Sequence, residues 1–547
     1  MDSKLKPRAT TLSVGALTLV AACSCLTAAA KPKTPNVVFI YADDLGKGML
    51  SCNGQKHLTT PNIDRIVEQG VKYDNAYSSA YSAPARASLL TGYNDCRNDK
   101  YKQTYGGPYC VADTTLIAAA EKKINDADLT YAKDDLTLAK VFKAAGYKTA
   151  AVGKLEWGFL STRKQMAARG WDHYYGYLDH QRCHGFYPSF LFTDGRMELI
   201  EGNTDPNAGV TLNGDSPEAT AARWNMEGKK VYCEDLFVDH IVNYIEENKD
   251  EQFFLYYPSI LPHGPVSIPA IHPELLANHE LTQIEKEYAS MVKKLDDNVG
   301  AILDKLESAG ILENTIVIFS ADNGHRVYYD SEGRTSNDIN LITGEAFDDY
   351  KNKFNSVTGG DRFNGNGSTS GYKRSNLDGG VNVPWAFYWK GHLEPRVSDQ
   401  LIANYDLLPT MADMLGVKLK VAKSGSSYLS ELMDQKPLKK DKYVITDSQV
   451  GGPMIVNNEE WKLRYYFKAK CFELFNTKED PMEQNNVIDA NPEIAAKLQA
   501  QLEAECAKGY GQTRFYVNNK EALDAMQAAF AARRAAMAKA KAAAKKK

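Results

Sequence analysis

The sequence predicts an α/β protein: a large, mixed, mostly parallel sheet between layers of helices, followed by a smaller C-terminal α+β subdomain. Four continuous apolar runs suit strands that are covered on both faces. They are residues 36–41, 147–152, 253–257 and 315–319. Amphipathic stretches at 136–145, 235–247 and 285–309 predict helices between them. This alternation is typical of parallel strands joined by helical crossovers.

Each of the four apolar runs ends in polar residues. These are Asp43 and Asp44, then Lys154, then His263, and finally Asp322 and Asn323. Ligands of open α/β sheets bind beyond the carboxyl ends of the strands. We therefore expect all four polar clusters to share one site.

The oxygen-bearing members of this set predict a metal site. Asp43, Asp44, Asp322 and Asn323 offer hard oxygen ligands, which suit Ca²⁺ or Mg²⁺ better than zinc. Each pair alone would more often be a turn or a helix cap. Their equivalent positions at two strand ends favour the metal.

The stretch 81–92 predicts a turn that enters a helix. Pro84 suits the first helical turn and Gly92 can end the helix. Ser82 then lies at the helix N-terminus, where free N–H groups favour anions, and Arg86 adds a cation one turn later. The plain alternative is a capping serine and a solvated arginine on a surface helix.

The same stretch resembles the signature of the type I sulfatases of the alkaline-phosphatase superfamily. The matching residues are Ser82, Pro84, Arg86, Leu89, Leu90, Thr91 and Gly92, and 60–65 and 70–73 upstream are also similar to the family. The resemblance implies a formylglycine made from Ser82 by a serine-type maturase. It also implies one Ca²⁺ held by Asp43, Asp44, Asp322, Asn323 and the oxygen of residue 82.

Further catalytic residues follow from the resemblance. Lys154 matches a lysine in a Gly-Lys-Trp-His motif, in which Glu156 here replaces the histidine. Glu156 either acts as a carboxylate base or is a neighbouring group whose role has moved elsewhere. His263 matches the acid for the departing alcohol, and Lys373 matches a sulfate-contacting lysine. His184, His325 and Arg326 are further candidates, for contacting the sugar.

The mechanism implied by the resemblance is attack on sulfur by one hydroxyl of the hydrated aldehyde, followed by elimination of sulfate. Substrate would be a sulfated carbohydrate. One alternative is a phosphatase or phosphodiesterase of the superfamily that uses unmodified Ser82 as nucleophile. Another is a non-catalytic protein that binds sulfated glycan. The phosphatase would typically need two transition metals with several Asp and His ligands.

Composition and cysteine spacing limit the kinds of partner and metal site that the sequence predicts. The 547 residues are 43% hydrophobic and 24% charged, with a net charge of −4, so no global basic field predicts nucleic-acid binding. Outside the N-terminal segment seven cysteines remain, without metal-like spacing, and Cys96 and Cys110 are the closest pair for a bridge.

The N-terminal segment 1–30 predicts export. A basic start precedes an apolar run of roughly 11 residues, which is too short to span a bilayer and typical of a signal peptide. The residues before Cys23 resemble a lipobox, and 28–30 form a competing cleavage site. We expect a periplasmic or cell-surface protein that meets the membrane only through export or, if the lipobox is used, through a lipid on Cys23.

Three regions complete the predicted organisation. Residues 34–417 form the catalytic domain, with a long loop at 326–372 and a last helix at 398–416. Residues 418–547 form the C-terminal subdomain, in which short strands at 461–467 and 471–475 predict a small sheet. The tail from residue 520 is rich in Ala, Lys and Arg and predicts a solvated helix.

Overall fold

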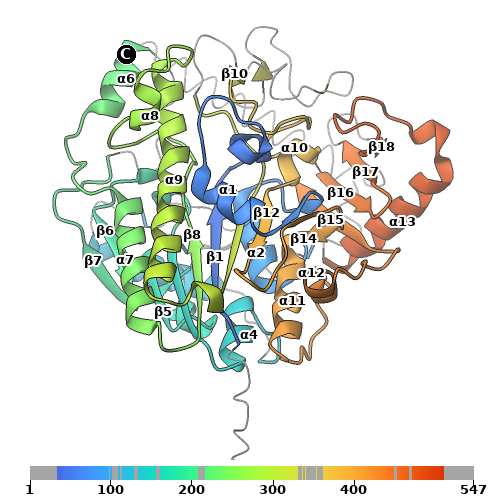
Figure 1. Ribbon diagram of the computed structural model, residues 1–547, viewed down its shortest axis with the longest axis horizontal. Coiled ribbons are helices and arrows are strands. Elements are labelled where there is room, and N and C mark those ends of the chain that lie inside the picture. The colour runs from blue at the N-terminus through green and yellow to red at the C-terminus, as the bar shows by residue number, and fades with distance from the viewer. Residues whose placement is uncertain are drawn as a thin grey trace, which may run out of the picture. The chain divides into compact units, whose positions relative to one another are not determined.

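In the computed structural model, a ten-stranded mixed sheet forms the core of the fold (Figure 1). Its five central strands, β9, β1, β8, β4 and β5, run parallel, and the sheet continues at each side through an antiparallel pairing, of β12 with β9 and of β6 with β5. In spatial order the strands are β13 (Arg396–Ser398), β2 (Val71–Tyr73), β12 (Trp385–Tyr388), β9 (Thr315–Ala321), β1 (Asn36–Ala42), β8 (Phe253–Pro258), β4 (Lys148–Lys154), β5 (His173–Tyr177), β6 (Phe190–Thr193) and β7 (Arg196–Leu199). The predicted fold class is confirmed.

The structure describes thirteen segments of the chain, and the elements below belong to one compact unit that begins at Pro35. The segments are 34–97, 99–100, 109–110, 114–127, 133–155, 161–206, 216–329, 335–336, 339–340, 353, 361–448, 452–466 and 471–509. The predictions for segment 1–30, for Glu156, for most of the loop at 326–372 and for the tail from residue 520 lie outside them.

Helices flank the sheet. One group comprises α1 and α7, which both pack on the long helix α9, and a second comprises α2, α4 and α11 (Figure 1). The three predicted helices correspond to α4, α7 and α9. The helices are α1 (Pro61–Glu68), α2 (Ser82–Thr91), α3 (Ile117–Ala127), α4 (Leu138–Ala144), α5 (Arg163–Ala168), α6 (Pro217–Trp224), α7 (Cys233–Asn248), α8 (Pro273–Leu276), α9 (Gln283–Ser308), α10 (Asp378–Val381), α11 (Leu407–Met414), α12 (Leu429–Asp434) and α13 (Pro492–Gly509).

Three of the central strands are buried along their whole length. Every residue of β1, β8 and β9 is buried, as expected for strands that are covered on both faces. Two minor sheets, each of two strands, lie apart from the large one. They pair β3 (Ala76–Tyr77) with β14 (Ile402–Ala403), and β10 (Thr335–Ser336) with β11 (Ile339–Asn340).

The prediction of one helix over 398–416 is wrong in its first half. There the chain finishes β13 and forms β14, which pairs with β3, and the helix α11 begins only at Leu407. Pro409 lies in the first turn of α11, where a missing N–H costs nothing. The helical spacing of apolar residues continued through 398–406, but the conformation of the β14 residues within this stretch is set by pairing with β3, which lies far away in the sequence.

The predicted small C-terminal sheet is present. It has four antiparallel strands, with α13 packed against two of them (Figure 1). The strands are β15 (Tyr443–Ser448), β16 (Gly452–Asn457), β17 (Trp461–Tyr466) and β18 (Cys471–Asn476). A buried ion pair connects this sheet to the rest of the fold, because Lys462 on β17 lies 2.5 Å from Asp378 on α10. Lys462 also pairs with Glu483, in the segment after β18, at 2.9 Å.

The expected pairing of Cys96 with Cys110 is wrong. Cys96 is fully buried whereas Cys110 is exposed, and the sulfur that Cys96 meets belongs to Cys506. Proximity in sequence was the only basis for the expected pair.

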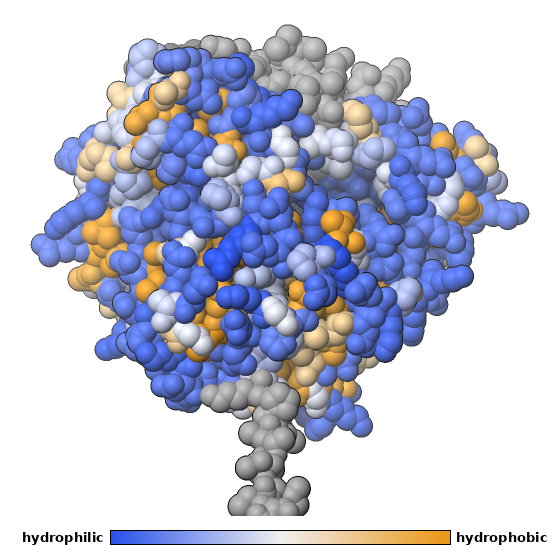
Figure 2. Space-filling model, in the orientation of Figure 1, coloured by the Kyte–Doolittle hydropathy of each residue, from blue (hydrophilic) through white to orange (hydrophobic). Residues whose placement is uncertain are grey.

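Figure 2 shows a mostly hydrophilic face on which hydrophobic residues form small, separate groups. No helix in the described part of the chain is long and apolar enough to cross a bilayer.

A pair of histidines between α7 and β5 predicts acid sensitivity. The Nε2 atoms of His240 and His173 lie 2.6 Å apart, and His173 Nδ1 lies 2.6 Å from an Asp194 oxygen. Burial, and then the charge of His173, lower the pKa of His240 to about 4. An unfolded histidine has a pKa of about 6.5, so between these values the unfolded chain binds a proton that the folded chain does not. Folding stability should therefore fall as the pH falls through this range.

When the pH is lowered from about 7 to about 5, we expect the thermal unfolding midpoint of His240→Gln to decrease by less than that of the wild type. The exposed His392 supplies the control, because His392→Gln should follow the wild type. Differential scanning fluorimetry across the pH range measures all three proteins. Equal losses in His240→Gln and wild type would contradict the assignment.

Candidate functional site

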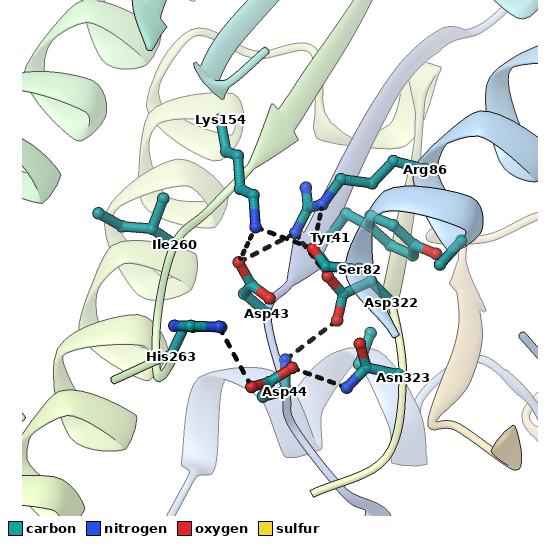
Figure 3. Close-up of polar contacts among 12 residues, drawn as sticks. Tyr41, Asp43, Asp44, Ser82, Arg86, Lys154, Ile260, His263, Asp322 and Asn323 are labelled. Carbon is teal, nitrogen blue, oxygen red and sulfur yellow. Dashed lines mark hydrogen bonds and ion pairs between the residues drawn. The ribbon is translucent and has the colours of Figure 1, made fainter. Parts of the chain in front are cut away.

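The site lies at the carboxyl edge of four adjacent parallel strands, in the order β9, β1, β8 and β4. Each strand delivers its polar residues there, because parallel strands end at the same edge. The residues are Asp322 and Asn323 after β9, Asp43 and Asp44 after β1, His263 after β8 and Lys154 at the end of β4. The structure thus brings together the clusters that the sequence singled out (Figure 3).

Ser82 is the first residue of α2, which points its N-terminus at this edge. Extended Tyr81 precedes the helix and Gly92 ends it with φ 73°, as predicted. The Ser82 hydroxyl accepts hydrogen bonds from Lys154 Nζ at 2.8 Å and from Arg86 Nε at 3.0 Å (Figure 3). Two cations and a helix N-terminus therefore surround this one oxygen.

The same cations form buried ion pairs with the aspartates. Lys154 Nζ lies 2.7 Å from Asp43 Oδ2, and Arg86 Nη2 lies 2.8 Å from Asp322 Oδ2 (Figure 3). Lys373 Nζ lies 2.8 Å from the Asp44 carboxylate. Three carboxylates and three cations balance in charge, which buried ionic groups require.

Asp44 lies at the centre of the cluster. Its backbone has φ 62°, a left-handed conformation that aspartate tolerates better than most residues. Its Oδ1 accepts from Asn323 Nδ2 at 2.7 Å and its N–H donates to Asp322 Oδ1 at 3.0 Å. These bonds fix the relative positions of the β1 and β9 strand ends.

The oxygen donors fit a divalent cation. Asp43 Oδ1 and Asn323 Oδ1 are buried and make no hydrogen bond to any described residue. Burial, and then the neighbouring Asp43 carboxylate, raise the pKa of Asp322 to about 7, so the crowded carboxylates favour a bound positive charge. Hard oxygens in this number suit Ca²⁺ or Mg²⁺.

His263 is held firmly beside this cluster. Its Nδ1 donates to the Gly264 carbonyl at 2.5 Å, which leaves Nε2 to accept from Lys373 Nζ at 3.0 Å. The ring of His184 stacks on it with centroids 4.1 Å apart and planes 10° apart. Burial, and then the charge of Lys373, lower the pKa of His263 well below its ordinary value.

Tyr328 is a member of the site that the sequence did not reveal. Its hydroxyl donates a hydrogen bond to Asp44 Oδ2, and its ring centroid lies 5.0 Å from that of His263. A side chain at Gly264 would collide with this ring, so the glycine is needed for the contact. Tyr328 lies in an irregular polar stretch, where no periodicity marks any one residue.

The remaining candidates are His325, Arg326 and Glu156. His325 is fully buried, with Nε2 2.9 Å from the Tyr329 hydroxyl and Nδ1 3.3 Å from the Tyr288 hydroxyl. Arg326 is partly exposed, and its guanidinium carbon lies 5.4 Å from the centre of the Tyr328 ring. Glu156 follows the last described residue of its segment, so its position is not described.

The geometry suits an oxyanion. Arg86 Nη1 is buried and makes no hydrogen bond to any described residue, so it can donate to a ligand. Arg86 and Lys154 both contact the Ser82 oxygen, and Lys373 lies on Asp44 and His263 nearby. Three cations next to a cluster of hard oxygen ligands can stabilise a tetrahedral anion and weaken the bond between its central atom and the ester oxygen.

Comparison with known proteins gives consistent results. The sequence model of the family described as Sulfatase matches residues 35–417, and the model described as N-sulphoglucosamine sulphohydrolase, C-terminal, matches 371–508. An N-acetylgalactosamine-6-O-sulfatase of Bacteroides thetaiotaomicron is 26% identical over 532 residues, covering 86% of this chain and 93% of that protein. Arylsulfatase A of Homo sapiens is 26% identical over 404 residues, covering 72% and 66%. The crystal structure of Ps i-CgsB in complex with k-i-k-neocarrahexaose has the same fold, with a TM-score of 0.63 and 22% identity, covering 91% and 98%.

Proposed function

Because the chain belongs to the sulfatase family and is a sulfuric ester hydrolase, we propose that it removes sulfate from a sulfated carbohydrate through a formylglycine made from Ser82 and one bound Ca²⁺. The observation that carries the proposal is the Ser82 hydroxyl, held by Lys154 and Arg86 beside three buried aspartates. The carbohydrate class rests on the relatives, among them an N-acetylgalactosamine-6-O-sulfatase.

The described side chains are suited to hold a formylglycine and a calcium ion. Hydrated formylglycine would supply one hydroxyl to attack sulfur and a second through which sulfate can be expelled. Asp43, Asp44, Asp322, Asn323 and the oxygen of residue 82 would hold Ca²⁺, which supplies positive charge next to the sulfate oxygens. Glu156 remains a candidate base for the second step.

The protein's own side chains have the remaining tasks. Lys154 and Arg86 orient the oxygen of residue 82, and both lie where negative charge on the sulfate can be offset. Lys373 adds a third cation, which is paired with Asp44. His263 presents Nε2 for proton transfer to the departing alcohol oxygen, with the Lys373 ammonium 3.0 Å away as the neighbouring proton donor. His184, His325 and Arg326 are proposed to contact or support the sugar side.

Removing His263 should affect substrates according to their leaving group. We expect His263→Ala to slow hydrolysis of a sugar sulfate by about 10³-fold, because a departing alkoxide needs a proton. Hydrolysis of 4-nitrophenyl sulfate should fall by no more than about 10-fold, since nitrophenolate leaves unprotonated. Steady-state kinetics on both esters measure the difference, with His392→Ala as the surface control. Equal losses on both esters would exclude the acid role.

A panel of defined sulfated mono- and oligosaccharides tests the function as a whole. The chain is co-expressed with a serine-type maturase, and the peptide containing residue 82 should then lose two hydrogens by mass. Release of inorganic sulfate from members of the panel is the expected result. Binding without release by fully converted protein would instead indicate a sulfated-glycan-binding protein.

The phosphatase alternative predicts different metals. Among the described residues, one group of three His, Cys, Asp or Glu side chains has its ligand atoms close enough to share an ion, namely Asp43, Asp44 and His263. One such group favours a single-ion site. Two zinc ions per chain and phosphate release with unmodified Ser82 would favour the phosphatase.

Domain division and location complete the proposal. We propose a catalytic domain over 34–417 and a C-terminal subdomain over 418–547. The chain is proposed to be exported by segment 1–30 to the periplasm or cell surface, with Cys23 as the candidate lipid attachment site.

A further inference from the structure

Two buried thiols from distant parts of the chain contact each other, and one of them lies in the turn that follows the helix carrying Ser82. The Sγ atoms of Cys96 and Cys506 lie 3.1 Å apart, although 410 positions separate them in sequence. Both residues have 0% of their surface exposed. Cys96 lies in the turn that follows α2, and Cys506 lies in α13.

Cys96 is packed into the C-terminal subdomain rather than into the large core. It belongs to the hydrophobic cluster between the four-stranded sheet and α13, whose other buried members all follow residue 444. Neighbouring hydrogen bonds hold the turn there. Asn94 Nδ2 donates to Glu505 Oε1 at 3.0 Å, and the Asp447 N–H donates to Asp95 Oδ1 at 2.5 Å. The two thiols are therefore held face to face by contacts on both sides.

We propose that Cys96 and Cys506 form a disulfide bond that ties α13 to the turn after the Ser82 helix. The sulfurs must approach by about 1 Å to reach the bond length of about 2.05 Å, a shift within reach of side-chain rotation. The oxidant is a disulfide such as oxidised glutathione. Each cysteine thiol loses one proton and one electron, the Sγ–Sγ bond forms, the donor disulfide breaks, and two donor thiols are released.

Burial determines when this bond can form. The hydrogen bond to Cys506, and then burial, raise the pKa of the Cys96 thiol, so little reactive thiolate exists once the protein has folded. The bond must close during folding, before the cluster around α13 seals, and it is then protected from external thiols. An oxidising compartment, as predicted from segment 1–30, supplies the required conditions.

Peptide mapping tests the bond directly. The full chain is produced in a thiol-oxidising and in a reducing host, denatured in iodoacetamide, and digested. From the oxidising host we expect a peptide pair joined through Cys96 and Cys506, two hydrogens lighter than the two reduced peptides together. From the reducing host both cysteines should be alkylated. The exposed Cys110 should be alkylated in both preparations and serves as the internal control.

Variants extend the test to stability. Cys506→Ser should release Cys96 as an alkylatable thiol, whereas the control Cys471→Ser should leave the joined pair intact. Oxidised wild type should melt about 3 °C above reduced wild type, because the closed loop is long. The double variant Cys96→Ser and Cys506→Ser should melt equally from both hosts. Alkylation of both cysteines in oxidised wild type, or equal melting of its two forms, would overturn the proposal.

Discussion

With alanine in place of Ser82, release of sulfate should be at least about 10⁴-fold slower than in the converted wild type. Alanine has no oxygen to accept the hydrogen bonds of Lys154 and Arg86, and it offers no atom that can attack sulfur. The cations and the metal ligands remain, so the variant should still bind sulfated glycan. Sulfate release and glycan binding, measured on the same preparation, separate these two effects.

A matched serine controls for disturbance of the helix. Ser88 is buried on the same helix α2 and is not one of the candidate site residues, so Ser88→Ala should retain most of the activity. Circular dichroism and thermal melting should show that Ser82→Ala is folded. A folded Ser82→Ala protein that keeps more than about a tenth of the wild-type rate would exclude residue 82 as the attacking group.

The site residues at the strand ends were predictable because the signal for each lies within a few neighbouring residues of the sequence. Asp43, Lys154 and Asp322 each follow a continuous apolar run, and a parallel sheet brings such ends to one edge. No long-range contact had to be known in advance. The helix at Ser82 was equally readable, since Pro84 and Gly92 mark its two ends.

What the sequence could not supply depends on contacts between distant residues. Tyr328 reaches Asp44 across 284 positions, from a stretch without any period. Ile402 joins a strand because Ala76 lies beside it, although an apolar helical pattern ran through the same residues. The sulfur of Cys96 contacts that of Cys506 rather than that of Cys110, the cysteine nearest to it in sequence. In each case packing of the whole chain decided among local alternatives.

Removal of calcium should abolish sulfatase activity reversibly. We expect dialysis against a chelator to lower activity to about 1% or less, because the three clustered aspartates would then be opposed only by their lysine and arginine partners and the sulfate would lose its strongest cation. Added Ca²⁺ should restore activity and raise the thermal midpoint. Elemental analysis should find one Ca²⁺ per chain in the restored protein.

Asp44→Asn should separate metal binding from folding. The amide keeps the shape of a side chain that contacts Asn323, Lys373 and Tyr328, but it removes one of the charges that would hold the ion. We expect at least about 100-fold more Ca²⁺ to be needed for half activation. Asp296→Asn is the matched control, since this aspartate is equally buried but accepts N–H groups at the start of α1. It should lower the thermal midpoint and leave the Ca²⁺ requirement unchanged. An unchanged requirement in Asp44→Asn would place the ion elsewhere, because a carboxylate that binds calcium directly cannot lose its charge without weakening that bond.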